Sequence, residues 1–250
     1  MKTLKYFLFI CFAAQFINAQ SSIVIGTGAS IDVALGADIC ADVITGTLTG
    51  DGTKCGAAIP KILNLTALIE GFYNGTTMVS DTVRVQFRNT AAPYSLVEEK
   101  KFVLSTAGAG TASLTSVLNG TSYYLVVRHR NSLETWSGAG KTFTSNVLNY
   151  DFTTAATQAY GSNMKLKGTK WCIINGDCNQ DDFIDGSDYL AIVNNWEAED
   201  PGMAGDTNGD QYIDGSDYLQ IVNNWEVGAV TPLTLKKVSK PITVDVKSLE

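Results

Sequence analysis

The 250-residue sequence predicts a mainly β protein in which a β-sandwich precedes a small α-helical module near the C-terminal end. Two observations predict the sandwich. Apolar residues alternate with polar ones in short runs over residues 61–170, and Gly, Asn or Pro turns separate these runs. One observation predicts the helical module: an acidic segment of 22 residues occurs twice, and each copy ends in an apolar stripe with helical spacing.

Residues 1–19 have the features of a secretory signal peptide. Lys2 and Lys5 flank the start of an apolar stretch that is too short to span a membrane, and Ala19 places a small residue at the expected cleavage position. No later stretch is long and apolar enough for a transmembrane helix. We therefore expect a secreted protein that is located in the extracellular space or at the cell surface.

Residues 20–60 are rich in Gly, Ala, Thr and Ile. Their brief alternating runs predict short strands and turns. The segment looks like the last coil of a β-solenoid or an accessory β-flap, and a flexible arm is the alternative. A strand from this segment could also be donated to a neighbouring molecule.

Residues 61–170 predict the sandwich itself. Val83, Val85 and Phe87 alternate with polar residues, and about seven such runs predict a single Greek-key sandwich without helices. Residues 120–136 resemble the strand and loop of prealbumin-like modules, which are accessory domains of secreted bacterial proteins. The resemblance implies an immunoglobulin-like fold and no particular chemistry.

Residues 176–197 and 205–226 are identical at 17 of 22 aligned positions, which indicates an internal duplication. Each copy begins with a twelve-residue loop rich in side-chain oxygens. Calcium takes six to eight oxygen ligands at about 2.3 to 2.6 Å, and positions one, three, five, nine and twelve, with the backbone carbonyl of position seven, can supply them. The predicted ligands are Asp177, Asn179, Asp181, Phe183, Asp185 and Asp188 in the first loop, and Asp206, Asn208, Asp210, Tyr212, Asp214 and Asp217 in the second.

Each loop leads into a predicted helix. Asp185 and Asp214 suit the N-cap positions, because a carboxylate there accepts backbone N–H groups and meets the positive end of the helix dipole. The apolar residues lie at i, i+3, i+4 and i+7, so we expect the two helices to pair through these stripes. The stripes are Tyr189, Ile192, Val193 and Trp196, and Tyr218, Ile221, Val222 and Trp225.

Residues 176–226 resemble the type I dockerin module, a tandem pair of loop-plus-helix calcium motifs. The resemblance implies two bound Ca²⁺ ions and a cohesin-like protein partner. In one departure from the family, the sixth loop position is Asp182 or Gln211 instead of Gly, which lowers the expected calcium affinity, more so in the second loop. The resemblance implies partner contacts at Gly186, Ser187, Val193 and Asn194, and at Gly215, Ser216, Val222 and Asn223.

Four cysteines remain after the signal peptide: Cys40, Cys55, Cys172 and Cys178. An even number in an exported protein predicts disulfides. Three pairings are possible, and the most economical joins sequence neighbours, Cys40 with Cys55 and Cys172 with Cys178. Zinc fits poorly because no Cys-x-x-Cys spacing occurs and His129, the chain's one histidine, is distant in sequence.

The negative charge is concentrated in one part of the chain. Residues 176–226 contain thirteen acidic residues and no Lys or Arg. Binding of nucleic acid requires clustered Lys and Arg, so this distribution argues against a nucleic-acid partner.

The sequence offers little material for catalysis. His129 lies in a predicted strand, where a structural imidazole is more common than a catalytic base. Ser122 and Ser132 are nearby but lack a Gly-x-Ser-x-Gly elbow. We therefore expect a protein that is not an enzyme.

Three functions remain open. The first is a calcium-binding docking protein, and the second is a subunit of an extracellular, pilus-like fibre in which residues 20–60 or 227–250 complete a neighbour's sheet. The third function is carbohydrate binding by an aromatic platform. The candidate platform residues are Tyr94, Tyr123, Tyr124 and Trp136.

The segment 81–83 resembles an O-glycosylation site of some exported proteins, with Thr82 as the acceptor.

Overall fold

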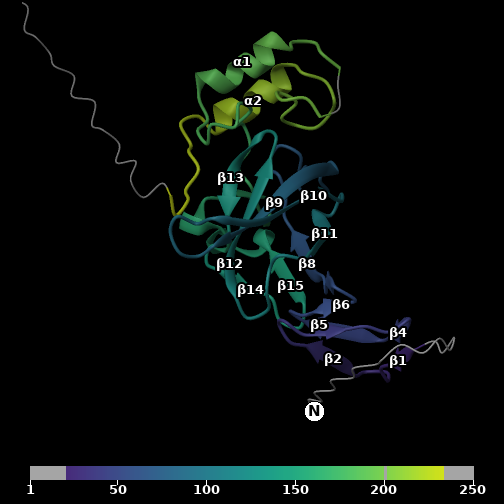
Figure 1. The fold of residues 1–250 in the computed structure, drawn as a ribbon. Helices are drawn as coiled ribbons and strands as arrows, with labels where there is room; N and C mark the ends of the chain where they lie inside the picture. Colours follow the sequence, from purple (N-terminus) through teal and green to yellow (C-terminus); the bar gives the residue numbers. More distant parts are fainter. Residues whose placement is uncertain (1–20, 200–201, 234–250) are drawn as a thin grey trace, which may run out of the picture.

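The computed structural model describes residues 21–199 and 202–233. The expected signal peptide lies outside these residues, as do residues 234–250 of the tail. Three parts follow one another in space as they do in sequence (Figure 1): short strands at one end, a two-sheet sandwich in the middle, and two α-helices at the other end. None of the described helices is long and apolar enough to cross a membrane.

Residues 22–58 form two stacked coils of short strands. Each strand of the first coil pairs in parallel with one strand of the second: β1 (Ser22–Val24) with β4 (Val43–Thr45), β2 (Ser30–Val33) with β5 (Thr47–Gly50), and β3 (Asp38–Ile39) with β6 (Thr53–Lys54). β7 (Ala57–Ala58) then turns back antiparallel to β6. Parallel pairing of successive turns of chain is the pattern of a β-solenoid. The described residues 22–58 therefore agree with the solenoid interpretation, and the assignment of residues 20–60 as a separate unit stays a prediction.

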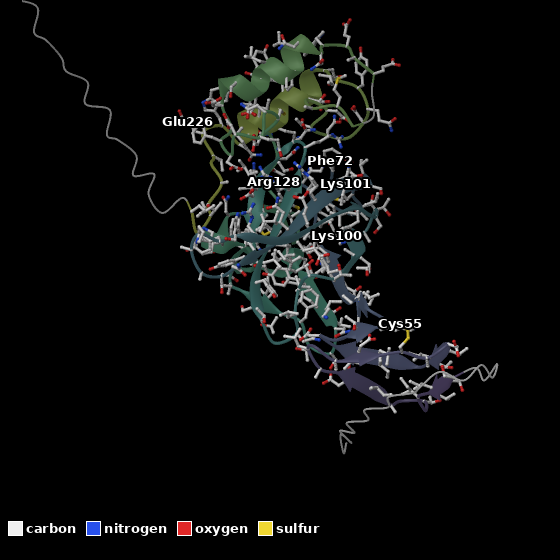
Figure 2. All side chains as sticks on the ribbon, viewed as in Figure 1. Cys55, Phe72, Lys100, Lys101, Arg128 and Glu226 are labelled. Atoms are coloured by element: carbon white, nitrogen blue, oxygen red, sulfur yellow. A yellow bond between two sulfur atoms is a disulfide. The ribbon has the colours of Figure 1, made fainter. Side chains whose placement is uncertain are left out.

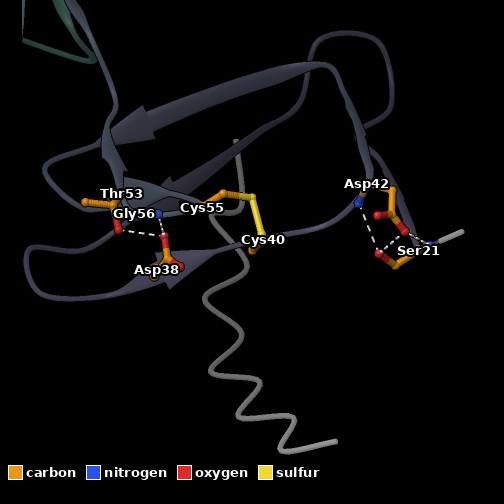
Figure 3. Close-up of a disulfide and its surroundings, with 7 residues drawn as sticks. All are labelled: Ser21, Asp38, Cys40, Asp42, Thr53, Cys55 and Gly56. Atoms are coloured by element: carbon orange, nitrogen blue, oxygen red, sulfur yellow. Dashed lines mark hydrogen bonds between the residues drawn. A yellow bond between two sulfur atoms is a disulfide. The ribbon is translucent and has the colours of Figure 1, made fainter. Parts of the chain in front are cut away.

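A disulfide joins the two coils (Figure 3). It links Cys40 to Cys55, as the sequence predicts. Beside it, the Asp38 carboxylate accepts hydrogen bonds from the Thr53 hydroxyl at 2.6 Å and from the Gly56 N–H at 3.0 Å. Such links matter here because two short coils bury too few apolar side chains to be stable by burial alone.

The middle part is a sandwich of two sheets. One sheet has the strand order β10-β9-β12-β13, with β14 also paired to β12, and the other has the order β11-β8-β15. β15 runs parallel to β8, and the other pairs are antiparallel. The strands are β8 (Lys61–Thr66), β9 (Asp81–Asn89), β10 (Leu96–Leu104), β11 (Ala109–Leu114), β12 (Ser122–His129), β13 (Ser132–Trp136), β14 (Lys141–Thr142) and β15 (Val147–Asp151).

The sandwich core lies between the two sheets. Because side chains alternate across a strand, the predicted alternating residues all reach the core from one face of their sheet. Val83, Val85 and Phe87 of β9 and Leu125 and Val127 of β12 are at most 1% exposed. The prediction of a mainly β protein with a sandwich and a small helical module is confirmed.

Short elements connect the sandwich to the helices. Three 3-10 helices, η1 (Phe152–Thr154), η2 (Ala156–Gln158) and η3 (Tyr160–Ser162), precede a hairpin of β16 (Lys165–Lys167) and β17 (Lys170–Cys172). The two helices follow as α1 (Gly186–Asn194) and α2 (Gly215–Asn223). Asp185 and Asp214 cap them, as predicted, and Asp188 and Asp217 complete a capping box in each.

The expected pairing of the helices through their whole apolar stripes is wrong. Of the first stripe only Ile192 is buried, whereas Tyr189, Val193 and Trp196 are 39%, 45% and 51% exposed. The rings of Tyr189 and Tyr218 lie 4.9 Å apart and provide one contact between the helices. Only Ile192 and Ile221 of the two stripes reach the second core, so the remaining stripe residues stay exposed.

The predicted Cys172–Cys178 disulfide is also wrong. Both cysteines are free and buried. Cys172 packs in the sandwich core, while Cys178 packs in a second core between the helices and the end of the sandwich. Proximity in sequence therefore does not bring the two sulfur atoms together. The second core contains Leu133, Ile174, Cys178, Ile184, Ile192, Ile213, Ile221 and Ala229.

Candidate metal site

The first acidic loop, residues 177–188, is folded around the carboxylate of its last residue. Asp188 Oδ1 accepts hydrogen bonds from the N–H groups of Cys178 at 2.7 Å and Asn179 at 3.1 Å. Its Oδ2 accepts a hydrogen bond from the N–H of Asp185 at 2.9 Å. One carboxylate thus joins the start of the loop to the start of α1.

The second loop, residues 206–217, repeats this arrangement. Asp217 Oδ1 accepts hydrogen bonds from the N–H groups of Thr207 at 2.7 Å and Asn208 at 3.1 Å. Its Oδ2 accepts one from the N–H of Asp214 at 3.0 Å. The duplication in the sequence is therefore matched by a duplicated hydrogen-bond pattern.

Side-chain hydrogen bonds draw the predicted ligands of the first loop together on its exposed side. The Asn179 amide donates to Asp181 Oδ2 at 3.1 Å and to the Ser187 hydroxyl oxygen at 2.6 Å. The Ser187 hydroxyl in turn donates to Asp185 Oδ1 at 2.7 Å. Loop positions three, five and nine are thereby connected. The second loop contains the same bonds among Asn208, Asp210, Ser216 and Asp214.

The sixth position of each loop has the backbone conformation for which the dockerin family uses glycine. Asp182 has a φ of 69° and Gln211 a φ of 71°. Both are in the left-handed region, which Asp tolerates better than Gln does. The sharp turn therefore forms without glycine, and the second loop carries more strain.

The carboxylates at positions one and twelve lie inside the protein. Asp177, Asp188, Asp206 and Asp217 are each at most 1% exposed. Burial, and then the charges of Asp188 and Asp182, raises the pKa of Asp177 to about 7. Burial also raises the pKa of the other three. Buried carboxylates need a compensating charge, so these residues fit a cation.

The donor atoms fit calcium better than a transition metal. The predicted ligands of both loops offer oxygen atoms only, which suits a hard cation. Within residues 21–199 and 202–233, however, no three His, Cys, Asp or Glu side chains group closely enough to hold a metal ion. The ligand set of each loop therefore stays a prediction.

The two loops meet the sandwich at the turn between β12 and β13. Asn131 in this turn is fully buried, and its backbone oxygen accepts a hydrogen bond from the N–H of Gly176 at 2.7 Å. Its side-chain oxygen accepts one from the N–H of Gly205 at 3.1 Å, and its amide donates to the Asp206 carbonyl at 2.5 Å. Gly176 and Gly205 precede equivalent loops, so one residue binds both copies of the repeat.

A second set of contacts fixes the end of α2 to the sandwich. The Asn224 amide donates to Glu70 Oε2 and to the Asn175 carbonyl, both at 2.7 Å. Lys165 pairs with Glu70 at 3.0 Å and donates to Asn224 Oδ1 at 2.6 Å. The Asn175 amide bonds to the Thr207 carbonyl. The module is therefore attached through buried polar contacts as well as through the second core.

Sequence reasoning missed the residues that make this junction, above all Asn131, Asn175 and Arg130, whose Nη2 lies 3.4 Å from Asp206 Oδ2. They lie outside the duplication, and the resemblance of residues 120–136, which include Arg130 and Asn131, implies no particular chemistry, so the sequence gives no signal for their role. Phe72 and Arg128, labelled in Figure 2, lie at the same end of the sandwich, next to the helical module. The junction becomes visible only in three dimensions.

His129 is part of a buried polar network. Its Nδ1 lies 3.1 Å from the Ser132 hydroxyl, and its Nε2 lies 3.2 Å from Asp81 Oδ2. The Ser132 hydroxyl also bonds to Asn175 Oδ1. Burial lowers the pKa of His129 to about 4, so the imidazole is neutral at physiological pH. Ser132 and His129 are at most 3% exposed, so a substrate has no access to this serine.

The predicted carbohydrate platform does not form as a set. Tyr123 and Trp136 are 4% and 1% exposed, and so their rings are not available for stacking with a sugar. Tyr94 and Tyr124 are partly exposed and pack edge to face around Trp136. Thr82, the predicted glycosylation site, is partly exposed within β9.

Residues 175–225 match the Dockerin type I domain. Type I dockerin domains are calcium-binding. The match confirms the resemblance seen in the sequence, and it concerns this module rather than the coils or the sandwich.

Two solved structures also align with the chain, and both are interface mutants of a type II cohesin-X-dockerin complex from Acetivibrio cellulolyticus. The C-terminal interface mutant aligns over 68% of this chain and 97% of its own chain, with 15% identity and a TM-score of 0.41. The N-terminal interface mutant aligns over 69% and 97%, with 14% identity and a TM-score of 0.37. No curated protein matches the chain.

The predicted partner-contact residues of the dockerin module lie on its surface. In both copies the Gly-Ser pair at the helix start and the Val-Asn pair near its end are exposed. Each pair in one copy has its equivalent in the other, because α1 and α2 have the same length and the same caps. The exposed residues are Gly186, Ser187, Val193, Asn194, Gly215, Ser216, Val222 and Asn223.

Proposed function

We propose that this protein is a secreted, non-enzymatic calcium-binding protein whose dockerin module binds a cohesin-like domain. The observation that supports this most strongly is that, within each loop and helix, the residues predicted to bind the ion are separate from those predicted to contact the partner. The innermost predicted ligands are buried, whereas the predicted partner-contact residues are exposed in both copies. The module can therefore bind ions on its inside and a partner on its outside.

The proposal assigns one Ca²⁺ to each loop. Asp177, Asn179, Asp181, Asp185 and Asp188, with the Phe183 carbonyl, would hold the first ion. Each ion supplies positive charge to buried carboxylates that otherwise repel one another. The second ion would be held by Asp206, Asn208, Asp210, Asp214 and Asp217, with the Tyr212 carbonyl.

The equivalence of the two exposed faces supports two orientations of the partner, related by the internal duplication. In one orientation Ser187 and its helix would form the main contact, and in the other Ser216 and its helix would do so. Either face alone is then sufficient for binding. Removal of one face therefore leaves binding nearly intact, whereas removal of both abolishes it.

Calorimetry with a panel of type I cohesin domains, with calcium and with EGTA, tests this proposal. We expect Ser187→Asp and Ser216→Asp each to leave the affinity for the bound cohesin within a few-fold, and the double variant to lose binding. Ser113→Asp, at an exposed position of β11, is the matched control. Unchanged binding of the double variant would rule out docking through these faces.

The coils at the other end of the molecule support a second candidate function, self-association into a fibre. Within the described chain, β1, β2 and β3 pair on one side only, with β4, β5 and β6. Residues 21–42 contain no Lys, Arg or Pro, the residues that commonly protect a sheet edge, and Val24 is 76% exposed. Light scattering over a concentration series tests this candidate, and a monomer at every concentration would exclude it.

A further inference from the structure

Arg130 places a fixed positive charge beside the second calcium loop. Its Nη2 lies 3.4 Å from Asp206 Oδ2, a predicted ligand oxygen. Three other contacts hold the guanidinium in place: Nη1 pairs with Asp81, Nε donates to the Met203 carbonyl at 3.2 Å, and the group lies 5.1 Å from the centre of the Phe72 ring. The charge is therefore fixed there independently of Asp206.

The first loop meets the sandwich through a neutral group instead. The Gln180 amide donates to the backbone oxygens of His129, Ser132 and Asp177 at 2.9, 3.3 and 3.0 Å. The Asp177 carboxylate accepts two N–H groups of its own loop, each at 3.2 Å. No positively charged side chain among the described residues forms an ion pair with it.

The fourth loop position explains the difference. It is Gln180 in the first loop and Gly209 in the second. A Cβ at Gly209 would lie 2.5 Å from carbon atoms of the Phe72 ring, and φ there is 78°, so the site accepts only glycine readily. Phe72 thus takes the space that the Gln180 side chain fills in the other copy, and Arg130 stacks on Phe72.

Arg128 does not create an equivalent charge at the first loop. Its Nη1 pairs with Glu134 at 2.8 Å. The loop residue on which its charge acts is Asp182, at the sixth position, which is not a predicted ligand.

We propose that Arg130 makes the two calcium sites unequal: it supplies part of the positive charge that Asp206 requires and thereby weakens calcium binding at the second loop. This inference rests on the proposed function, because it assumes that both loops bind calcium. The first loop then fills at a lower calcium concentration than the second. Docking that needs both loops would respond to the second, weaker site.

A site-resolved titration tests the proposal in the mature protein. The backbone N–H signals of Asp182 and Gln211 in two-dimensional NMR spectra report on the two loops separately during addition of CaCl2. We expect the Asp182 signal to reach its midpoint first. In Arg130→Met, which keeps the contact with Phe72 but removes the charge, we expect the Gln211 midpoint to fall at least about tenfold, because a divalent ion and a fixed charge repel strongly at a separation of several ångströms.

Three variants separate the effect of Arg130 from other causes. Arg130→Lys keeps the charge and should stay close to the wild type. Arg84→Met removes a charge from an exposed position of the same sheet and should change neither midpoint. Gln211→Gly relieves the turn but leaves Arg130 in place, so the Gln211-loop site should remain the weaker one.

Each outcome is decisive. Equal midpoints in the wild type, or an unchanged second midpoint in Arg130→Met, would overturn the inference while leaving calcium binding intact. If neither signal moves on addition of CaCl2, the proposed function itself fails. If Arg130→Met does not fold, the wild-type order together with Arg130→Lys and Gln211→Gly still tests whether the charge sets the order.

Discussion

Asn131→Ala should destabilise the whole molecule, because it removes the residue that binds both loops. Asn131 is fully buried, and its side chain makes two hydrogen bonds, one from the Gly205 N–H and one to the Asp206 carbonyl. Alanine leaves both backbone groups without a partner in a buried place. An unsatisfied buried group costs roughly 1 to 3 kcal/mol, so the two together cost about 2 to 6 kcal/mol before any water enters. We expect a loss of about 3 kcal/mol.

Urea unfolding followed by tryptophan fluorescence, in saturating calcium, measures this loss as a change in the free energy of unfolding. Asn64→Ala is the matched control, because Asn64 is exposed on β8 and its side chain bonds only to two exposed side chains, Asn149 and Thr111. Its substitution should change the stability by no more than about 0.5 kcal/mol. A loss below about 1 kcal/mol in Asn131→Ala would refute the view that this turn anchors the module.

Three further predictions concern single positions. Gly209→Ala should lower the free energy of unfolding by more than about 2 kcal/mol in thermal or urea unfolding, because the new Cβ would meet the Phe72 ring. Gly75→Ala, at a φ of 103° with open space around it, should lower it by only about 1 kcal/mol, and equal losses would contradict the contact with Phe72. Gln211→Gly should raise the melting temperature in calcium by roughly 2 to 4 °C, because it removes about 1 kcal/mol of strain from the left-handed backbone conformation. A lower melting temperature would show that the turn is unstrained. Cys172 and Cys178 should not react with a thiol reagent in the folded protein, because both are buried and burial raises the pKa of Cys172 to about 12. Both should react after unfolding in guanidinium, and fewer than two reactive thiols in the unfolded protein would indicate a disulfide.

The parts of the fold that the sequence predicted depend on local spacing. Carboxylates at fixed intervals specify the loop and the helix cap together, so Asp185 and Asp188 indicated where α1 begins. Alternation of apolar residues likewise indicated which side of β9 faces the core. Both patterns repeat within a few residues, and a repeated pattern is strong evidence even in one sequence.

The parts that the sequence did not predict depend on single contacts between distant segments. Cys172 and Cys178 are neighbours in sequence but pack in different cores, and no periodicity indicates this. The helix stripes suggested too wide a contact because periodicity does not tell a side chain that faces a core from one that faces a partner. Asn131 and Arg130 lie in an ordinary hairpin turn, and their role follows from where that turn is placed.

That placement explains how a symmetric surface can be built on an asymmetric interior. The β12–β13 turn lies between the two loops, and Asn131 bonds to the glycine before each of them. A single turn cannot present the same side chain to both copies. The first loop therefore contacts the turn through its own Gln180 amide, whereas the second loop contacts Arg130 of the turn. The difference stays on the buried side, because the residues at the loop-to-helix junctions are exposed and identical in the two copies. We therefore expect a partner to find two equal faces and calcium to find two unequal sites.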